Sequence, residues 1–313
     1  MSRVVWWNGK FIPEAEAKVS IYDSALMFGD CAFEMTRTFN KKQFKLREHL
    51  ERLYASCKYL RIEIPYSIEE LERYCLETQA ANEPCFAPDD EHRLMINVTR
   101  GLLSIYKDTG PEGVNVIIAD FPLRWTVQGM GRLFDTGINA VIPSQRVPTG
   151  IEAKVKCRSR IPFLMANIEV SQCKGENNWA LLLDKDGYIA EGTGSNFFAV
   201  LGDEIVTPIG DNVLRGISRA HIFELGRGII NFRVRQDNIT PYDVIDASEA
   251  FFTGTPFCIL PCTSLNGQQI GDGKPGRITQ YFLNRWGEML GVDIEQQIKG
   301  WDNGTTGISP YRF

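Results

Sequence analysis

The sequence predicts an α+β protein made of two domains. Three observations lead to this prediction: strand patterns that recur in hairpins, amphipathic helices separate from those strands, and one irregular stretch near mid-chain. The chain has 313 residues, of which 43% are hydrophobic; this length suits two domains or one large one, with ample apolar material for a core. The irregular stretch has two prolines and a glycine without periodicity. We therefore expect domains at 1–142 and 154–313, joined by a linker at 143–153.

The first elements are predicted from local patterns. The stretch "VVWWNGKFIP" has an Asn-Gly pair between two apolar runs, which predicts a hairpin, and "AFEMTRTFNKKQFKL" repeats the arrangement with a turn near Asn40 to Lys42. The apolar period then becomes helical over residues 46–60. Ser67 and Glu70 form a capping-box pattern, which predicts the start of a second helix.

The later elements follow the same rules. We expect strands in "RLMINVTRG" and "VNVIIADF", a helix at about 161–174, and an amphipathic helix after "LRGISR". Further strands are predicted in "NWALLLDKDGYIAEG", "SNFFAVLGDEIVTP" and "EAFFTGTPFCILP".

Composition restricts the partners and the compartment. The net charge of -5 argues against nucleic-acid binding, and no apolar run is long enough for a membrane span or a signal peptide. The eight cysteines include no CxxC pair, and the three histidines form no zinc spacing, so we expect free thiols, no metal and a cytoplasmic protein.

Four short motifs could carry chemistry. Glu191, in "GYIAEGTGSNFF", lies between a strand and a glycine turn and would need a positive partner if buried. "GISR" could offer helix-terminal amides to a phosphate, although on local sequence we favour Ser218 as a simple N-cap. "TGTP" fits a phosphate site and a tight turn equally well. In "AKVKCRSR", Lys154 and Lys156 would face one side of an extended segment, and either could be a nucleophilic amine or merely solvated.

Five motifs in order resemble one known family, the class IV (fold-type IV) pyridoxal-phosphate-dependent enzymes. This family contains branched-chain aminotransferases, D-amino-acid aminotransferases and aminodeoxychorismate lyases. The motifs are "SIYDSALMFGDCAFEMTRTF", "REHLERLYASCKYLRIEIP", "GYIAEGTGSNFFAV", "LRGISR" and "EAFFTGTPFCILP". The resemblance implies the two-domain fold-type IV architecture, pyridoxal 5'-phosphate (PLP) as cofactor and a homodimer.

The resemblance also implies roles for single residues. Glu191 stands where the family binds the pyridine nitrogen of the cofactor, and Arg52 where it binds the phosphate. The backbone N–H groups of Ile217 and Ser218 and the hydroxyl of Thr255 would bind the same phosphate.

The resemblance implies Lys156 as the catalytic Schiff-base lysine. Lys156 lies 35 residues before Glu191 (191 − 156), which is close to the family separation. Lys154 is the alternative, because an alignment shift of two residues would exchange the two lysines.

The substrate is inferred from positions where this chain differs from the patterns of the family's branches. D-Amino-acid aminotransferases have an arginine and a histidine where this chain has Ile105 and Lys107, and lyases have a catalytic threonine where it has Met35. Met35 and Phe33 would line an apolar substrate pocket, or could equally belong to the core.

Arg93 and Met95 replace the Tyr-x-Arg pair of branched-chain aminotransferases. Arg93 could bind a substrate carboxylate, or could pair with a surface acid, which we favour from sequence.

Together these features predict transfer of an amino group from an apolar or branched-chain L-amino acid to a 2-oxo acid such as 2-oxoglutarate. The alternatives are a D-amino-acid or (R)-amine aminotransferase, an aminodeoxychorismate lyase-like enzyme, and a cofactor-binding protein without activity. The last is disfavoured by the presence of both a candidate lysine and Glu191.

Overall fold

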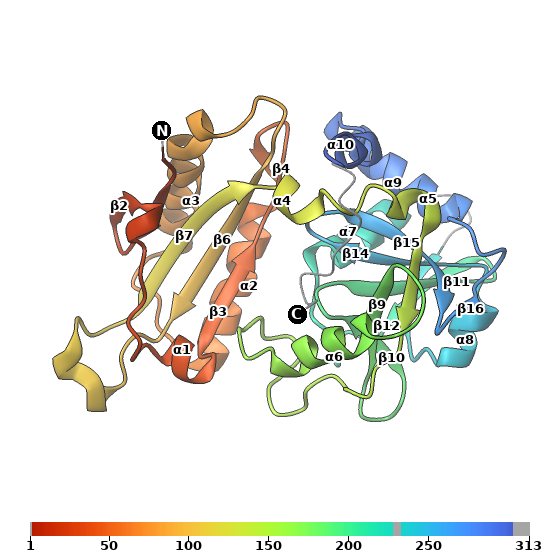
Figure 1. Ribbon diagram of the computed structural model, residues 1–313, viewed down its shortest axis with the longest axis horizontal. Coiled ribbons are helices and arrows are strands. Elements are labelled where there is room, and N and C mark those ends of the chain that lie inside the picture. Colours follow the sequence, from red (N-terminus) through yellow and green to blue (C-terminus); the bar gives the residue numbers. More distant parts are fainter. Residues whose placement is uncertain (1, 228–232, 303–313) are drawn as a thin grey trace. The chain divides into compact units, whose positions relative to one another are not determined.

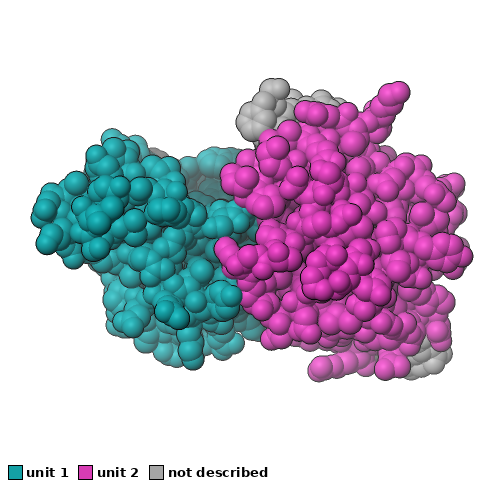
Figure 2. Space-filling view, turned by 90° about the horizontal axis from the view of Figure 1, so that it is seen from below, with its two compact units in different colours: residues 1–125, 155–160 teal, residues 126–154, 161–313 magenta. Residues whose placement is uncertain are grey.

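The computed structural model describes residues 2–227 and 233–302 and divides into two compact units. Unit 1 comprises residues 1–125 and 155–160, and unit 2 comprises residues 126–154 and 161–313 (Figure 2). The mixture of hairpins, sheets and separate helices confirms the α+β prediction.

The units divide the chain at other places than the predicted domain boundaries. Residues 126–142 belong to unit 2, because β8 (Ile138–Val141) pairs there with β9 and β15. Residues 155–160 belong to unit 1, where Cys157 forms a bridge with Ala32. The expected linker, 143–153, lies within unit 2.

Unit 1 is built on a five-stranded antiparallel sheet with the strand order β2-β1-β7-β6-β3. Its strands are β1 (Val4–Trp7), β2 (Lys10–Pro13), β3 (Cys31–Met35), β6 (His92–Thr99) and β7 (Asn115–Pro122). The predicted first hairpin is confirmed, with Asn8 and Gly9 at positive φ angles of 44° and 90°. A separate hairpin joins β4 (Thr38–Phe39) and β5 (Lys42–Gln43).

Two long helices pack on one face of this sheet (Figure 1). They are α2 (Leu46–Leu60) and α3 (Ile68–Asn82), and they confirm both helix predictions, including the capping box at Ser67 and Glu70. Because side chains alternate along a strand, Leu94, Ile96 and Val98 face this core, and the odd-numbered residues of β6 face the other side. Shorter elements of unit 1 are α1 (Ser24–Phe28) and the 3-10 turns Glu14–Glu16, Glu83–Cys85 and Ser104–Thr109.

Unit 2 contains a nine-stranded sheet with the order β10-β9-β8-β15-β14-β11-β12-β13, and β16 pairs with β15. The bounds of the remaining strands are β9 (Asn178–Leu183), β10 (Ile189–Gly192), β11 (Asn196–Leu201), β12 (Glu204–Pro208), β13 (Arg233–Asp237), β14 (Glu249–Gly254), β15 (Cys258–Leu265) and β16 (Gln268–Gln269). A further pairing between β10 and β11 closes six of these strands into a ring.

Several helices surround the strands of unit 2 (Figure 1). They are α5 (Leu133–Thr136), α6 (Ile161–Ser171), α7 (Ile217–Gly226), α8 (Pro241–Asp246), α9 (Arg277–Leu290) and α10 (Ile294–Gly300), while α4 (Arg124–Val127) crosses the division between the units. The predicted helix at 161–174 is present but ends three residues earlier. Within the two described ranges, no helix is long and apolar enough to cross a membrane.

Candidate active site

Lys156 lies in unit 1 beside the outer edge of β3. Its carbonyl oxygen accepts a hydrogen bond from Phe33 N at 3.1 Å, and its backbone N–H donates to Ser56 Oγ on α2, also at 3.1 Å. Its Nζ lies 4.6 Å from the ring centroid of Phe33. The backbone of this lysine is therefore fixed from two elements, and its amine lies against the Phe33 side chain.

Lys154, the alternative lysine, lies in a turn of unit 2 and forms ion pairs with Asp211 at 3.1 Å and Glu152 at 3.6 Å. The expectation that Lys154 and Lys156 face one side of a strand is wrong, because residues 153–154 form a turn and not a strand.

Arg52 is held by a buried network that the sequence did not predict. Its Nε and Nη2 donate to the two carboxylate oxygens of Glu34 at 2.6 and 2.8 Å, and Nδ1 of His49 lies 2.8 Å from the same carboxylate. His49, Arg52 and Ser56 recur at helical spacing on α2, below the core-facing side of β3. A bidentate pair of this kind fixes the plane of the guanidinium group.

The charges of this network follow from its burial. Burial alone would raise the pKa of Glu34, but the charge of Arg52 and the hydrogen bonds with Arg52 and His49 outweigh it and hold that pKa well below its usual range. Burial also lowers the pKa of His49 despite the attraction of Glu34. The network is thus an Arg52–Glu34 ion pair with a neutral imidazole beside it.

Replacing Glu34 with glutamine should destabilise the protein by about 3 kcal/mol near pH 7, because it leaves the Arg52 charge buried without its partner. A carboxylate with a depressed pKa stabilises the fold above its ordinary value of 4.5, and this contribution is lost as the pH falls further. Urea unfolding of wild type and Glu34→Gln from pH 7 to pH 3 should show the difference between them shrinking below pH 4.5. Glu51→Gln, an exposed change on the same helix, is the control, and a difference that stays constant with pH would contradict the assignment.

Glu191 lies in β10 of unit 2 and is only 7% exposed. Its Oε2 accepts hydrogen bonds from Leu214 N at 2.9 Å and from Asn196 Nδ2 at 3.3 Å. Asn196 is its cross-strand partner, and on the other side of β11 Asn196 is paired with Thr253. A carboxylate held by two hydrogen bonds of this kind keeps a fixed direction.

Gly216 and Arg219 support this carboxylate. A Cβ at Gly216 would lie 2.0 Å from Asn196 Oδ1, so only glycine allows the backbone to approach the asparagine this closely. Burial lowers the pKa of Arg219 to about 10, while the charge of Glu191 acts in the opposite direction. Arg219 Nη2 donates to Pro208 O and Gln236 Oε1, and this places a fixed cation near Glu191.

The predicted phosphate-binding groups of unit 2 lie at two chain turns. The N-cap of α7 is Gly216, so the interpretation of Ser218 as N-cap is wrong, and Ile217 and Ser218 are the first two helical residues. The first four N–H groups of a helix have no partner within the helix, which leaves these two amides available to a ligand. Thr255 lies in the tight turn between β14 and β15.

The predicted substrate residues share one face of the unit 1 sheet. Phe33 and Met35 alternate along β3 on the side away from α2 and α3, and Arg93 of β6 contacts the sulfur of Met35 at 3.7 Å. The expectation that Arg93 pairs with a surface acid is wrong. Its side chain is buried, and no ion pair is found for it in the described part of the chain.

The structure thus groups the predicted residues in two sets. Unit 1 contains the first set, which is Lys156, Arg52, Phe33, Met35 and Arg93. Unit 2 contains the second set, which is Glu191, Ile217, Ser218 and Thr255. Sequence reasoning missed Glu34, His49 and Asn196. The i, i+3 spacing of His49 and Arg52 was the one signal for a shared partner.

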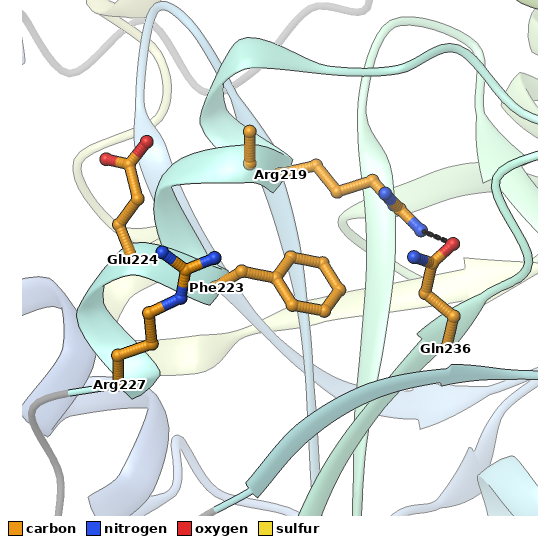
Figure 3. Close-up of a pocket in the computed structure, with 6 residues that line it drawn as sticks. Arg219, Phe223, Glu224, Arg227 and Gln236 are labelled. Carbon is orange, nitrogen blue, oxygen red and sulfur yellow. Dashed lines mark hydrogen bonds between the residues drawn. The ribbon is translucent and has the colours of Figure 1, made fainter.

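A separate hollow of about 390 Å³ lies on unit 2 along α7 and β13 (Figure 3). It is lined by Arg219, Ala220, Phe223, Glu224, Arg227 and Gln236. None of the predicted site residues lines it, so we do not assign it to the active site.

Unit 1 carries a fixed lysine and an oriented arginine, and unit 2 carries a buried glutamate; these are residue types that PLP chemistry uses. The sequence pattern of the family described as amino-transferase class IV matches residues 31–265. The chain belongs to this family and is a class IV aminotransferase (EC 2.6.1.-).

Two relatives carry the name of branched-chain aminotransferases. The chain is 33% identical to a putative branched-chain-amino-acid aminotransferase of Methanocaldococcus jannaschii, over 90% of this chain and 94% of that protein. It is 29% identical to the branched-chain-amino-acid aminotransferase of Escherichia coli K12, over 88% and 89% of the two chains.

Two solved structures of branched-chain aminotransferases match the fold of this protein over nearly the whole chain. The T.th. branched-chain amino acid aminotransferase with pyridoxamine 5'-phosphate has a TM-score of 0.81 at 26% identity, covering 96% of this chain and 98% of that one. The Thermoproteus uzoniensis branched-chain aminotransferase with norvaline has a TM-score of 0.80 at 27% identity, with the same coverage. These matches confirm the prediction of the fold-type IV architecture.

Proposed function

We propose that this protein is a PLP-dependent aminotransferase that transfers the amino group of an apolar or branched-chain L-amino acid to a 2-oxo acid such as 2-oxoglutarate. The observation that carries the proposal is the placement of Lys156. Its backbone is anchored by Phe33 and Ser56, and its amine lies against an apolar side chain of the sheet face that also carries Met35.

The residues present fit the proposed cofactor. The aldehyde of PLP needs an amine, its phosphate needs an arginine and amides, and its ring nitrogen needs a carboxylate; unit 1 offers Lys156 and Arg52, and unit 2 offers Glu191. His49 Nε2 and Thr253 Oγ1 are among the buried polar atoms that have no hydrogen-bond partner in the described residues, and a bound ligand would supply one. When bound, PLP supplies an electron sink for the charge that develops at the substrate α-carbon.

The protein groups have separate roles in this proposal. Arg52, kept planar and oriented by Glu34 and His49, binds the phosphate, as do the amides of Ile217 and Ser218 and the hydroxyl of Thr255. Each of these contacts positions the ring without taking part in bond changes.

Two residues act on protons. The Nζ of Lys156 holds the cofactor and then moves the proton of the substrate α-carbon. Glu191, fixed by Asn196 and Leu214, keeps a proton on the ring nitrogen, because an adjacent carboxylate favours the charged form of a base.

The substrate side chain is proposed to lie against Phe33 and Met35. Both belong to β3, and Met95 is directly opposite Met35 on β6, so three apolar side chains share this part of the sheet face. Methionine is unbranched and adapts to side chains of different shape. The names of the relatives support the same choice of branched substrates.

The proposal includes a homodimer in the cytoplasm. Unit 1 exposes a run of apolar side chains at residues 19–28, with Ile21, Leu26 and Phe28 each more than 60% exposed, and a second copy would cover such a surface. All eight cysteines lie in the described ranges, and none of them forms a disulfide bond there, which suits a reducing compartment. Sedimentation equilibrium would measure the mass, and a monomer at micromolar concentration would contradict the dimer.

A donor panel tests the proposed reaction. The PLP-loaded protein should convert L-leucine, L-isoleucine and L-valine in the presence of 2-oxoglutarate, with glutamate formed in equal amounts, and it should use their D-enantiomers at least about 100-fold less well. Preference for D-amino acids would contradict the stereochemistry. Release of pyruvate from aminodeoxychorismate without an acceptor would instead identify a lyase.

A further inference from the structure

Arg93 is a buried guanidinium with unsatisfied donors. It is 7% exposed, and its Nε and Nη1 have no hydrogen-bond partner within residues 2–227 and 233–302. Its Nη2 donates to a thioether, Met35 Sδ, at 3.7 Å. Burial of an unpaired charge is costly, so such a group in a native fold points to a ligand that completes it.

A second arginine lies opposite Arg93. The β3–β6 ladder pairs Met35 with Met95 and continues with a hydrogen bond from Thr36 N to Leu94 O at 3.0 Å, so the next pair in this register is Arg37 with Arg93.

The Arg37 side chain is fully buried. Burial, together with the like charge of Arg37, lowers the pKa of Arg93 to about 9. Like charges directly opposite each other destabilise a sheet, and an anion between them would remove that penalty.

The nearest carboxylate in the sequence does not supply this anion to Arg93. Glu91 accepts hydrogen bonds from the backbone N–H groups of Asn40 at 2.7 Å and Lys41 at 3.0 Å, and it makes no hydrogen bond to Nε or Nη1 of Arg93. Within the described residues, no carboxylate is hydrogen-bonded to Nε or Nη1 of Arg93, and an anionic ligand would accept from both.

Arg93 lies on the same sheet face as the candidate lysine. Lys156 Nζ lies over the ring of Phe33, and Arg93 contacts Met35, the next residue on that face of β3. Two residues along a strand span about 7 Å. Phe33 and Met35 are therefore about 7 Å apart, and the long side chains of Lys156 and Arg93 contact one each. A small molecule could present an amine to Lys156 and a carboxylate to Arg93 across this distance.

We infer that Arg93, with Arg37 behind it, binds the carboxylate of the substrate and so selects 2-amino and 2-oxo acids over simple amines. This inference rests on the proposed function. The planar guanidinium suits a carboxylate, whose two oxygens can accept two parallel hydrogen bonds. The apolar Phe33 and Met35 then face the substrate side chain.

The test compares leucine with 3-methylbutylamine, which has the same side chain without the carboxylate. Half-reactions of the PLP-loaded wild type, Arg93→Met and Arg93→Lys are followed by absorbance. Arg93→Met keeps an unbranched apolar stem but removes the guanidinium group, and should reduce the preference for leucine over the amine by about 100-fold, the usual effect of a lost charged hydrogen bond. The preference of Arg93→Lys for leucine should lie between those of wild type and Arg93→Met. Arg73→Met, an exposed change on α3, should show the wild-type preference.

A binding measurement provides a readout independent of turnover. The carboxylic acid 4-methylvaleric acid should raise the unfolding temperature of the PLP-loaded wild type and have no effect on Arg93→Met. The inference is overturned if Arg93→Met keeps the wild-type preference, or if the acid stabilises both proteins equally. A wild type that is stabilised by the acid but converts no amino donor would refute the proposed function and leave the carboxylate site standing.

Discussion

Replacing Lys156 with alanine is expected to reduce turnover by about 10⁴-fold, the upper range for the loss of a general acid–base group. The proposal gives this one amine two tasks, since it first holds the cofactor and then carries the substrate proton. Its backbone contacts with Phe33 and Ser56 do not involve the side chain, so the variant should fold normally. Single-turnover absorbance with leucine measures the proton-transfer step directly.

Lys154→Ala is the matched control for this prediction. Lys154 belongs to a turn and is paired with Asp211 and Glu152, so its loss should change turnover by less than about threefold. The opposite pattern, an active Lys156→Ala and an inactive Lys154→Ala, would show that the assignment of the two lysines is reversed.

The second large effect is expected at Glu191. Glu191→Gln should still bind PLP, because Arg52 and the helix amides bind the phosphate, but its half-reaction with leucine should slow by about 10²- to 10³-fold. A neutral amide in place of the carboxylate no longer favours a protonated ring nitrogen, and the electron sink is weaker. Equilibrium dialysis measures cofactor affinity, and rapid-mixing absorbance measures the rate.

Glu176→Gln, an exposed change in the same unit, is the control for Glu191 and should match wild type in both measurements. Turnover near normal in Glu191→Gln would show that the carboxylate has another role. A loss of cofactor affinity with an unchanged rate would place Glu191 among the binding contacts only.

Local patterns predicted the elements of this fold well. The Asn8-Gly9 turn, the helix at residues 46–60 and the capping box of Ser67 and Glu70 each depend on neighbours within a few residues, and all three are confirmed. Such local patterns did not predict which strands pair with each other when they lie far apart in the sequence. β8 joins the unit 2 sheet through parallel partners, β9 and β15, and no hairpin signal marks a parallel pair.

The sequence predicted the motifs of the candidate site but not the residues that hold its side chains in place. Arg52 and Glu191 stood within recognisable segments, whereas the partners that fix them, Glu34 and Asn196, depend on which strand lies next to which. Arg93 shows the same difficulty. Arginine is usually exposed, so sequence favoured a surface pair, and only its position on a buried sheet face shows a guanidinium without an acid.

The most direct measurement for the proposed chemistry is borohydride reduction of the PLP-loaded protein, followed by proteolysis and peptide mapping. Reduction fixes the cofactor to whichever amine holds it. The account predicts a single labelled peptide that contains Lys156, with Lys154 unmodified. Label on Lys154, or a protein in which no lysine is labelled, would contradict it.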